Sequence, residues 1–205
     1  MVGDVRRGWL DETTWLDLGR GWLADDGEVY DAVAGSDGWR QNTVWQFDHA
    51  RAENRLTGWT RRGPGAVHPA VAAADRALRA RYGVDFGSGA SMVHYRDGRD
   101  AMGAHRDSDM RWTEETVVAI LTLGTRRPWT LTPVGARSPA LDVSPDGGDL
   151  IVLGGRAQRD WLHGVPPVPG LRAGRISVQW RWTSRRGRPE SGPNSGASRR
   201  WGNTR

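Results

Sequence analysis

The segment Arg175–Trp182, RISVQWRW, is the stretch that decides the fold, because polar and apolar side chains alternate along it. Alternate side chains of a β-strand point to opposite faces of a sheet. Two arrangements of this strand stay open. The polar face meets water, as is usual in antiparallel sheets, or it lines a barrel, where its arginines would hold an anionic ligand. A straight strand of six residues covers roughly 20 Å, so both arginines reach one small ligand only if their side chains lean together or the strand coils.

Further strands are predicted before this segment. Thr116–Gly124, TVVAILTLG, is almost entirely apolar and is predicted to be a buried strand, with Trp129–Val134 as its hairpin partner. Short strands at regular spacing, with helices only in the first half, predict an α+β, mainly β fold: a sandwich or barrel buttressed by N-terminal helices. The other predicted strands are Ala90–Arg96, Asp149–Leu153 and Asp160–Val165.

Two helices are predicted in the first half of the chain. Residues 11–24 place Trp15, Leu18, Trp22 and Leu23 at helical spacing. Pro69–Tyr82 is rich in alanine, leucine and arginine, begins with proline in its first turn, and is followed by Gly83. The region between them, 38–65, is expected to be irregular.

Composition limits the classes of protein to which this chain can belong. Its 205 residues suit one domain with a sizeable core. Cysteine is absent, so any metal must be held by histidine, aspartate or glutamate. The longest apolar run, Val117–Leu123, is far too short to span a bilayer, and no apolar signal sequence is seen at the start. We therefore expect a cytoplasmic monomer without membrane partners.

Positive charge is concentrated at the C-terminus. The chain has 29 basic residues, all arginine, and 24 acidic residues. Six arginines and one acid lie from Thr183 onward, which leaves 23 of each sign and no net charge in residues 1–182. We expect one domain over 1–182. Residues 183–205 are rich in glycine, serine and proline and are predicted to form a basic disordered tail.

A histidine and two carboxylates recur at every second position in HRDSD, residues 105–109. In an extended segment His105, Asp107 and Asp109 would share one face, which suits a metal site, an acid/base pair or an ordinary surface strand. His163 follows a predicted strand and a Gly-Gly turn, which would return it to the sheet. Two imidazoles and one carboxylate form the facial triad of non-haem Fe(II) oxygenases. His49, His68 and His94 are expected to be structural or exposed.

Five motifs occur along the chain in this order: YRDGRDAMGAHRD, VVAILTLG, GGDLIVLGG, WLHGVP and RISVQWR. Together they resemble the AlkB family of Fe(II)/2-oxoglutarate dioxygenases, most closely its actinobacterial-type branch. The resemblance covers roughly residues 39–182 and implies a double-stranded β-helix, or jelly-roll, core. It divides the domain into an N-terminal helix and substrate lid, 1–66, and a helix with the jelly-roll core, 67–182.

The resemblance implies a complete cofactor site. Fe(II) would be bound by His105, Asp107 and His163, with 2-oxoglutarate and O2 as co-substrates. The remaining assignments concern 2-oxoglutarate: Arg175 and the Tyr95 hydroxyl would hold its distal carboxylate, and Arg181 would lie near the carboxylate at the metal. Val93 and Ser177 stand where the family carries asparagine, so the hydrogen bonds expected there are weakened, although Ser177 stays a predicted contact.

The resemblance also implies a nucleic-acid substrate. Typical members demethylate cationic bases such as 1-methyladenine and 3-methylcytosine, flipped out of the stack. Asp109 stands where the family often carries an acid that complements these lesions, and a solvated loop acid is the alternative. Trp45 and Phe47 fall where the base-contacting lid lies and could stack on a base; packing in the core is the alternative for both rings.

Three functions are carried forward. The first is oxidative demethylation of N-alkylated bases in DNA or RNA, with a local patch of Arg51, Arg55, Arg61 and Arg62 in its favour. The second is hydroxylation of a small molecule or peptide in a biosynthetic pathway, which the neutral charge of residues 1–182 favours, since nucleic-acid binding profits from net positive charge. The third is a non-catalytic jelly-roll binding module.

Overall fold

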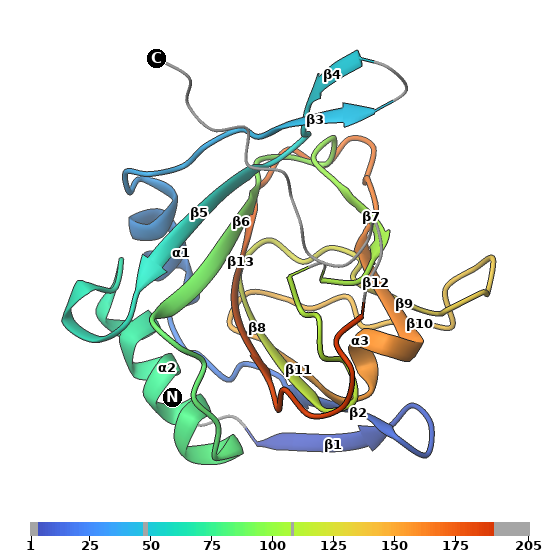
Figure 1. The fold of residues 1–205 in the computed structure, drawn as a ribbon. Helices are drawn as coiled ribbons and strands as arrows, with labels where there is room; N and C mark the ends of the chain where they lie inside the picture. Colours follow the sequence, from blue (N-terminus) through green and yellow to red (C-terminus); the bar gives the residue numbers. More distant parts are fainter. Residues whose placement is uncertain (1–3, 47–48, 108, 191–205) are drawn as a thin grey trace, which may run out of the picture.

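The structure, a computed structural model, describes residues 4–46, 49–107 and 109–190. Its strands pair antiparallel and form a major sheet, a minor sheet and a separate two-stranded sheet (Figure 1). The major sheet contains, in spatial order, β1 (Val5–Trp9), β2 (Thr14–Gly19), β11 (Leu150–Gly155), β8 (Thr116–Gly124), β13 (Arg175–Thr183), β6 (Gly89–Tyr95) and β5 (Leu56–Arg61). The minor sheet contains β10 (Leu141–Asp142), β9 (Thr130–Pro133), β12 (Trp161–Val165) and β7 (Met102–His105). The mainly β, jelly-roll fold that the sequence predicts is confirmed.

Two hydrophobic cores cover the two faces of the major sheet. On the outer face, α1 (Asp26–Ala34) and α2 (Pro69–Tyr82) pack on the sheet, and they lie along its left side in Figure 1. On the inner face the major sheet packs against the minor sheet. The inner core includes Tyr95, Ile120, Trp129 and Leu131. The side chains between the two sheets lie next to this inner core.

The helix predicted over 69–82 is confirmed at both ends. His68 caps α2 by accepting a hydrogen bond at Nδ1 from the Ala70 amide, 3.1 Å away. Gly83 ends it at φ 65°, a left-handed conformation that glycine adopts without steric cost. None of the helices in the described ranges is long and apolar enough to cross a membrane.

The helix predicted over residues 11–24 is wrong. Residues Thr14–Gly19 form β2, which lies between β1 and β11 in the major sheet. Both faces of β2 are covered: Leu16 belongs to the inner core, while Trp15 packs on the outer core. Because a strand buried on both faces need not alternate between polar and apolar residues, its pattern imitated the spacing of a helix.

The predicted hairpin between Thr116–Gly124 and Trp129–Val134 is also wrong. β8 already pairs on one side with β11 and on the other with β13, so it offers no free edge. The chain leaves β8 at Gly124, where φ is 80°, and crosses to the minor sheet. There β9 pairs with β10 and β12.

The region expected to be irregular, 38–65, contains three strands. β5 closes one edge of the major sheet, and the separate two-stranded sheet is formed by β3 (Thr43–Gln46) and β4 (His49–Ala52), which projects from the top of the barrel in Figure 1. The short elements of the chain are the 3-10 turn η1 (Gly63–Gly65) and α3 (Ala157–Asp160). The predicted basic tail, 183–205, lies largely outside the described residues, and its disorder stays a prediction.

Candidate metal centre

Three side chains, from β7, from β12 and from the loop after β7, converge between the two sheets. His105, Asp107 and His163 each offer a ligand atom, and these atoms all lie within 4.8 Å of one another. The convergence follows from strand register, because His105 in β7 pairs directly with His163 in β12. Their ring centroids are 4.4 Å apart. Asp107 follows two residues later, so the H-x-D spacing and one cross-strand pair assemble the cluster.

The hydrogen bond of His105 selects its tautomer. Its Nδ1 lies 2.8 Å from the carbonyl oxygen of Gly103. Because a carbonyl can only accept, Nδ1 must carry the hydrogen and donate it. In the neutral ring Nε2 then keeps its lone pair, which is the arrangement found in most metal-binding histidines. Burial lowers the pKa of His105 and favours this neutral form.

Asp107 is held by hydrogen bonds at one carboxylate oxygen and at its backbone. Arg181 Nη2 donates to Oδ1 at 2.9 Å, and the Asp107 amide donates to Gln158 Oε1 at 2.8 Å. The other oxygen, Oδ2, is buried and has no partner among the described residues. Burial opposes ionisation, but Arg181 and then His163 outweigh it and hold the pKa of Asp107 well below its usual range. Asp107 therefore presents a charged, unshared oxygen to the cluster.

His163 completes the cluster as a neutral base. It is buried beneath Trp129, with ring centroids 5.8 Å apart and planes 22° from parallel. Burial lowers the pKa of His163 to about 4, although the charge of Asp107 acts in the opposite direction. Two neutral imidazoles and one carboxylate are the donor set of the non-haem Fe(II) facial triad. The orphaned Oδ2 atom and the chemistry of the donors thus fit a ferrous ion.

The cluster opens onto a cavity of about 270 Å³. The three donors lie in its wall together with side chains from β6, β13 and the loop before β5. Besides the donors, the wall includes Tyr95, Ser177, Gln179, Arg181, Arg55 and Asp109.

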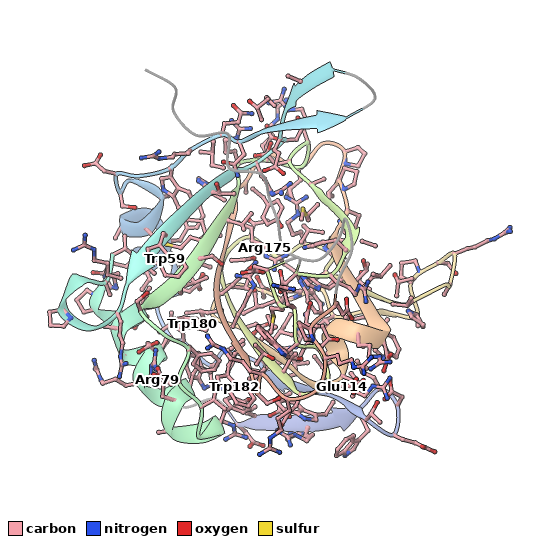
Figure 2. All side chains as sticks on the ribbon, in the orientation of Figure 1. Trp59, Arg79, Glu114, Arg175, Trp180 and Trp182 are labelled. Carbon is pink, nitrogen blue, oxygen red and sulfur yellow. The ribbon has the colours of Figure 1, made fainter. Side chains whose placement is uncertain are left out.

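Strand β13 presents its polar face to the interior of the barrel. Ile176, Val178 and Trp180 pack in the outer core, while Arg175 and Ser177 are buried on the opposite face. Figure 2 shows Arg175 inside the barrel and Trp180 toward α2. The polar face of β13 therefore lines the barrel and does not meet water, whereas the binding of an anionic ligand by its arginines stays a prediction.

The two arginines of β13 occupy different parts of the interior. Arg181 bonds Asp107 and the hydroxyl of Ser91 beside the metal centre. Arg175 is fully buried; its guanidinium carbon lies 5.9 Å from the centroid of the Tyr95 ring, and its Nη2 lies 3.5 Å from Thr122 Oγ1. Its Nε and Nη1 have no partner within the described chain. Arg175 is thus a buried cation with free donors, and burial lowers its pKa to about 10.

The predicted substrate contacts are only partly described. Asp109 is exposed and lines the cavity, close to Asp107. Trp45 lies in β3, but its side chain falls outside the described part of the structure, and so does the whole of Phe47. In the predicted arginine patch, Arg55 lines the cavity and pairs with Glu53 at 2.7 Å, whereas Arg62 lies near two acids of the α2 region.

Two contributors to the site were missed by sequence reasoning. Gln158 in α3 supports the Asp107 backbone, and Trp129 covers His163. Nothing local in the sequence distinguishes either residue, because both act through contacts with segments far away along the chain.

The sequence matches the model of the 2OG-Fe(II) oxygenase superfamily over residues 40–181, and the chain belongs to this superfamily. It is therefore a dioxygenase that uses Fe(II), 2-oxoglutarate and O2. No protein with a curated description matches the sequence.

Two solved structures are similar in fold. One is a prolyl hydroxylase in complex with a hypoxia inducible factor peptide fragment from Trichoplax adhaerens, with a TM-score of 0.58 and 14% identity over 80% of this chain and 83% of that one. The other is OsALKBH1, with a TM-score of 0.52 and 17% identity over 87% of this chain and 100% of that one. At these identities the likeness shows the fold alone.

Proposed function

We propose that this dioxygenase belongs to the AlkB branch and demethylates N-alkylated bases in DNA or RNA. When iron is bound, it supplies the oxidative chemistry: O2 and 2-oxoglutarate are consumed, succinate and carbon dioxide form, and an N-methyl group leaves as formaldehyde. The order of the motifs around Tyr95, His105, His163 and Arg175 supports the branch. The similarity in fold to OsALKBH1 is consistent with it.

The side chains around Arg175 and Tyr95 are suited to the co-substrate. The unpartnered donors of Arg175 would bind the distal carboxylate of 2-oxoglutarate. Burial raises the pKa of Tyr95, so its hydroxyl keeps its proton at neutral pH and can donate a further hydrogen bond to that carboxylate. Ser177 would contact the co-substrate from β13, and Arg181 orients Asp107 at the metal end.

Asp109 is the observation that favours an alkylated base as the substrate. Its carboxylate is exposed on the wall of the cavity, two residues beyond Asp107 of the donor cluster. The lesions 1-methyladenine and 3-methylcytosine are cationic, and a carboxylate on the cavity wall would attract such a cation. Asp109 is thus placed to favour the charged lesion over the neutral, repaired base.

The test is formaldehyde release from oligonucleotides that carry 1-methyladenine or 3-methylcytosine. We expect the parent protein to release formaldehyde. In Asp109→Asn the rate of formaldehyde release should fall at least about tenfold, because one favourable charge contact near the reacting group is removed. Decarboxylation of 2-oxoglutarate without substrate serves as the control and should be unchanged in the variant. Absence of formaldehyde under conditions of confirmed iron binding would eliminate the demethylase.

A hydroxylase acting on a small molecule or peptide is the second candidate. The absence of net charge over residues 1–182 favours it, since a groove for nucleic acid usually gains affinity from positive charge. Substrate-stimulated succinate formation with peptides or small molecules, together with no response to methylated oligonucleotides, would support this candidate. The superfamily match and the converging donor atoms argue against a non-catalytic binding module.

A further inference from the structure

A second buried arginine, Arg127, lies beside Tyr95 and outside the five family-like motifs. Arg127 belongs to the connection between β8 and β9, and only 2% of its surface is exposed. No carboxylate forms an ion pair with Arg127 within the described ranges. The adjacent residue, Arg126, is exposed to solvent. Burial of a guanidinium without an acidic partner lowers the free energy of unfolding, so a buried Arg127 requires an explanation.

The guanidinium of Arg127 joins two loops through three backbone carbonyls. Nη1 donates to Asp97 O at 3.1 Å, while Nη2 donates to Asp100 O at 2.7 Å and to Pro166 O at 2.9 Å. Asp97 and Asp100 lie in the loop from β6 to β7, and Pro166 directly follows β12. One side chain therefore links the loop that follows Tyr95 at the end of β6 to the loop that follows β12, the strand that contains His163.

Arg127 also lies beside Tyr95, one of the proposed contacts of the distal carboxylate. Its guanidinium carbon lies 5.1 Å from the centroid of the Tyr95 ring, and that of Arg175 lies 5.9 Å from the same centroid. Two buried cations thus flank one aromatic ring, and neither has a carboxylate partner among the described residues. Like charges in a buried site repel each other, and a bound anion relieves this repulsion.

We propose that Arg127 is a positioning residue of the 2-oxoglutarate site, which holds Tyr95 and its two loops in place and adds a second positive charge behind the distal carboxylate. A purely structural link would need hydrogen-bond donors but no charge. The inference rests on the proposed placement of 2-oxoglutarate against Arg175 and Tyr95.

The experiment measures the dissociation constant of 2-oxoglutarate by calorimetry, with full-length protein loaded with Mn(II) under anaerobic conditions. Arg127→Gln keeps amide donors and removes the charge, whereas Arg127→Lys keeps the charge. We expect Arg127→Gln to weaken 2-oxoglutarate binding by about 10- to 100-fold, a range typical of residues that orient a ligand's direct contacts. Arg127→Lys should recover most of this loss, and Arg126→Gln, the adjacent exposed control, should bind like the parent.

Each result has one interpretation. If Arg127→Lys and Arg127→Gln lose the same affinity, or if neither loses any, the charge has no role and the inference is overturned. A loss of Mn(II) affinity equal to the loss of 2-oxoglutarate affinity would also overturn it, because the defect would then lie in the fold. If Arg175→Met binds 2-oxoglutarate like the parent, the proposed co-substrate placement fails instead. Thermal unfolding of each variant without ligand identifies a general loss of structure.

Discussion

At His105, Asp107 and His163, neighbouring groups set the protonation state that a metal ligand needs. The Gly103 carbonyl fixes the tautomer of His105, and burial keeps both imidazoles neutral. Arg181 keeps Asp107 charged and occupies only one of its oxygens. Metal binding then releases few protons at neutral pH, so little of the binding free energy is spent on deprotonation.

His163→Ala should weaken Fe(II) binding by more than about 100-fold, because it removes one of three protein ligands. Loss of a residue that only hydrogen-bonds to a metal ligand already lowers metal affinity by about 10- to 100-fold. Anaerobic titration with Fe(II) measures the affinity. Asp109→Asn is the control, since Asp109 is exposed and lies outside the donor cluster. Unchanged iron affinity in His163→Ala would refute the metal centre.

Arg175→Met should stabilise the ligand-free protein by about 1–3 kcal/mol, because replacing a buried unpaired charge by an apolar side chain of similar size is often favourable. The same change should abolish the rise in melting temperature that 2-oxoglutarate causes in the parent. Both quantities come from urea and thermal unfolding. A destabilised variant that still responds to 2-oxoglutarate would contradict the role given to Arg175.

At the scale of the element, local sequence signals succeeded where an element's own residues decide its structure. The sequence predicts both ends of α2, because Pro69 in its first turn and Gly83 just past its end are local features. β8 and β13 were predicted because long apolar or alternating runs favour strands. The sequence reasoning failed for β2, for the pairing of β9 and for the strands within residues 38–65. The first two depend on which segments cover a strand and which strand edges are already paired. In the third, β5 becomes a strand by pairing with β6, a segment far along the chain.

Gly154→Ala should destabilise the junction of β11 with β2 by about 1–3 kcal/mol, the usual cost of overpacking. A Cβ at position 154 would lie 1.8 Å from the ring of Trp15, which is confined between Arg7 and Tyr82. Gly27→Ala is the matched control, because no atom lies within 4 Å of a Cβ there and alanine favours the helix. Equal unfolding free energies for the two variants would contradict this packing.

At the scale of the whole molecule, the fold separates a structural core from a functional one. The outer core, beneath α1 and α2, is apolar, whereas the donor cluster and the buried arginines lie next to the inner core, against Trp129 and Tyr95. Buried ionisable groups of this kind make the stability of the metal-free protein depend on pH.

The metal-free protein should lose stability as the pH falls from 6.5 to about 4. In this window the unfolded chain protonates His163, with an ordinary pKa of 6.5, whereas burial lowers the pKa of His163 in the folded protein to about 4. The loss for this group is about 3 kcal/mol, since one pKa unit corresponds to about 1.4 kcal/mol. Urea unfolding of chelator-treated protein at several pH values measures it, and His163→Gln should show a shallower pH dependence. The contribution of Asp107 disappears only below its unfolded pKa of 3.8, outside this window.

The sequence by itself determined the mainly β fold and the helix 69–82, because alternation and helix-end signals are properties of short segments. The H-x-D spacing and the resemblance to a known family singled out His105, Asp107 and His163 as candidate donors, and the structure brings these three side chains together. The tertiary structure decided that the polar face of β13 points inward, that His163 pairs with His105, and that Arg127 lies beside Tyr95. These facts depend on strand order and register, which bring together residues far apart along the chain, and no local pattern encodes them.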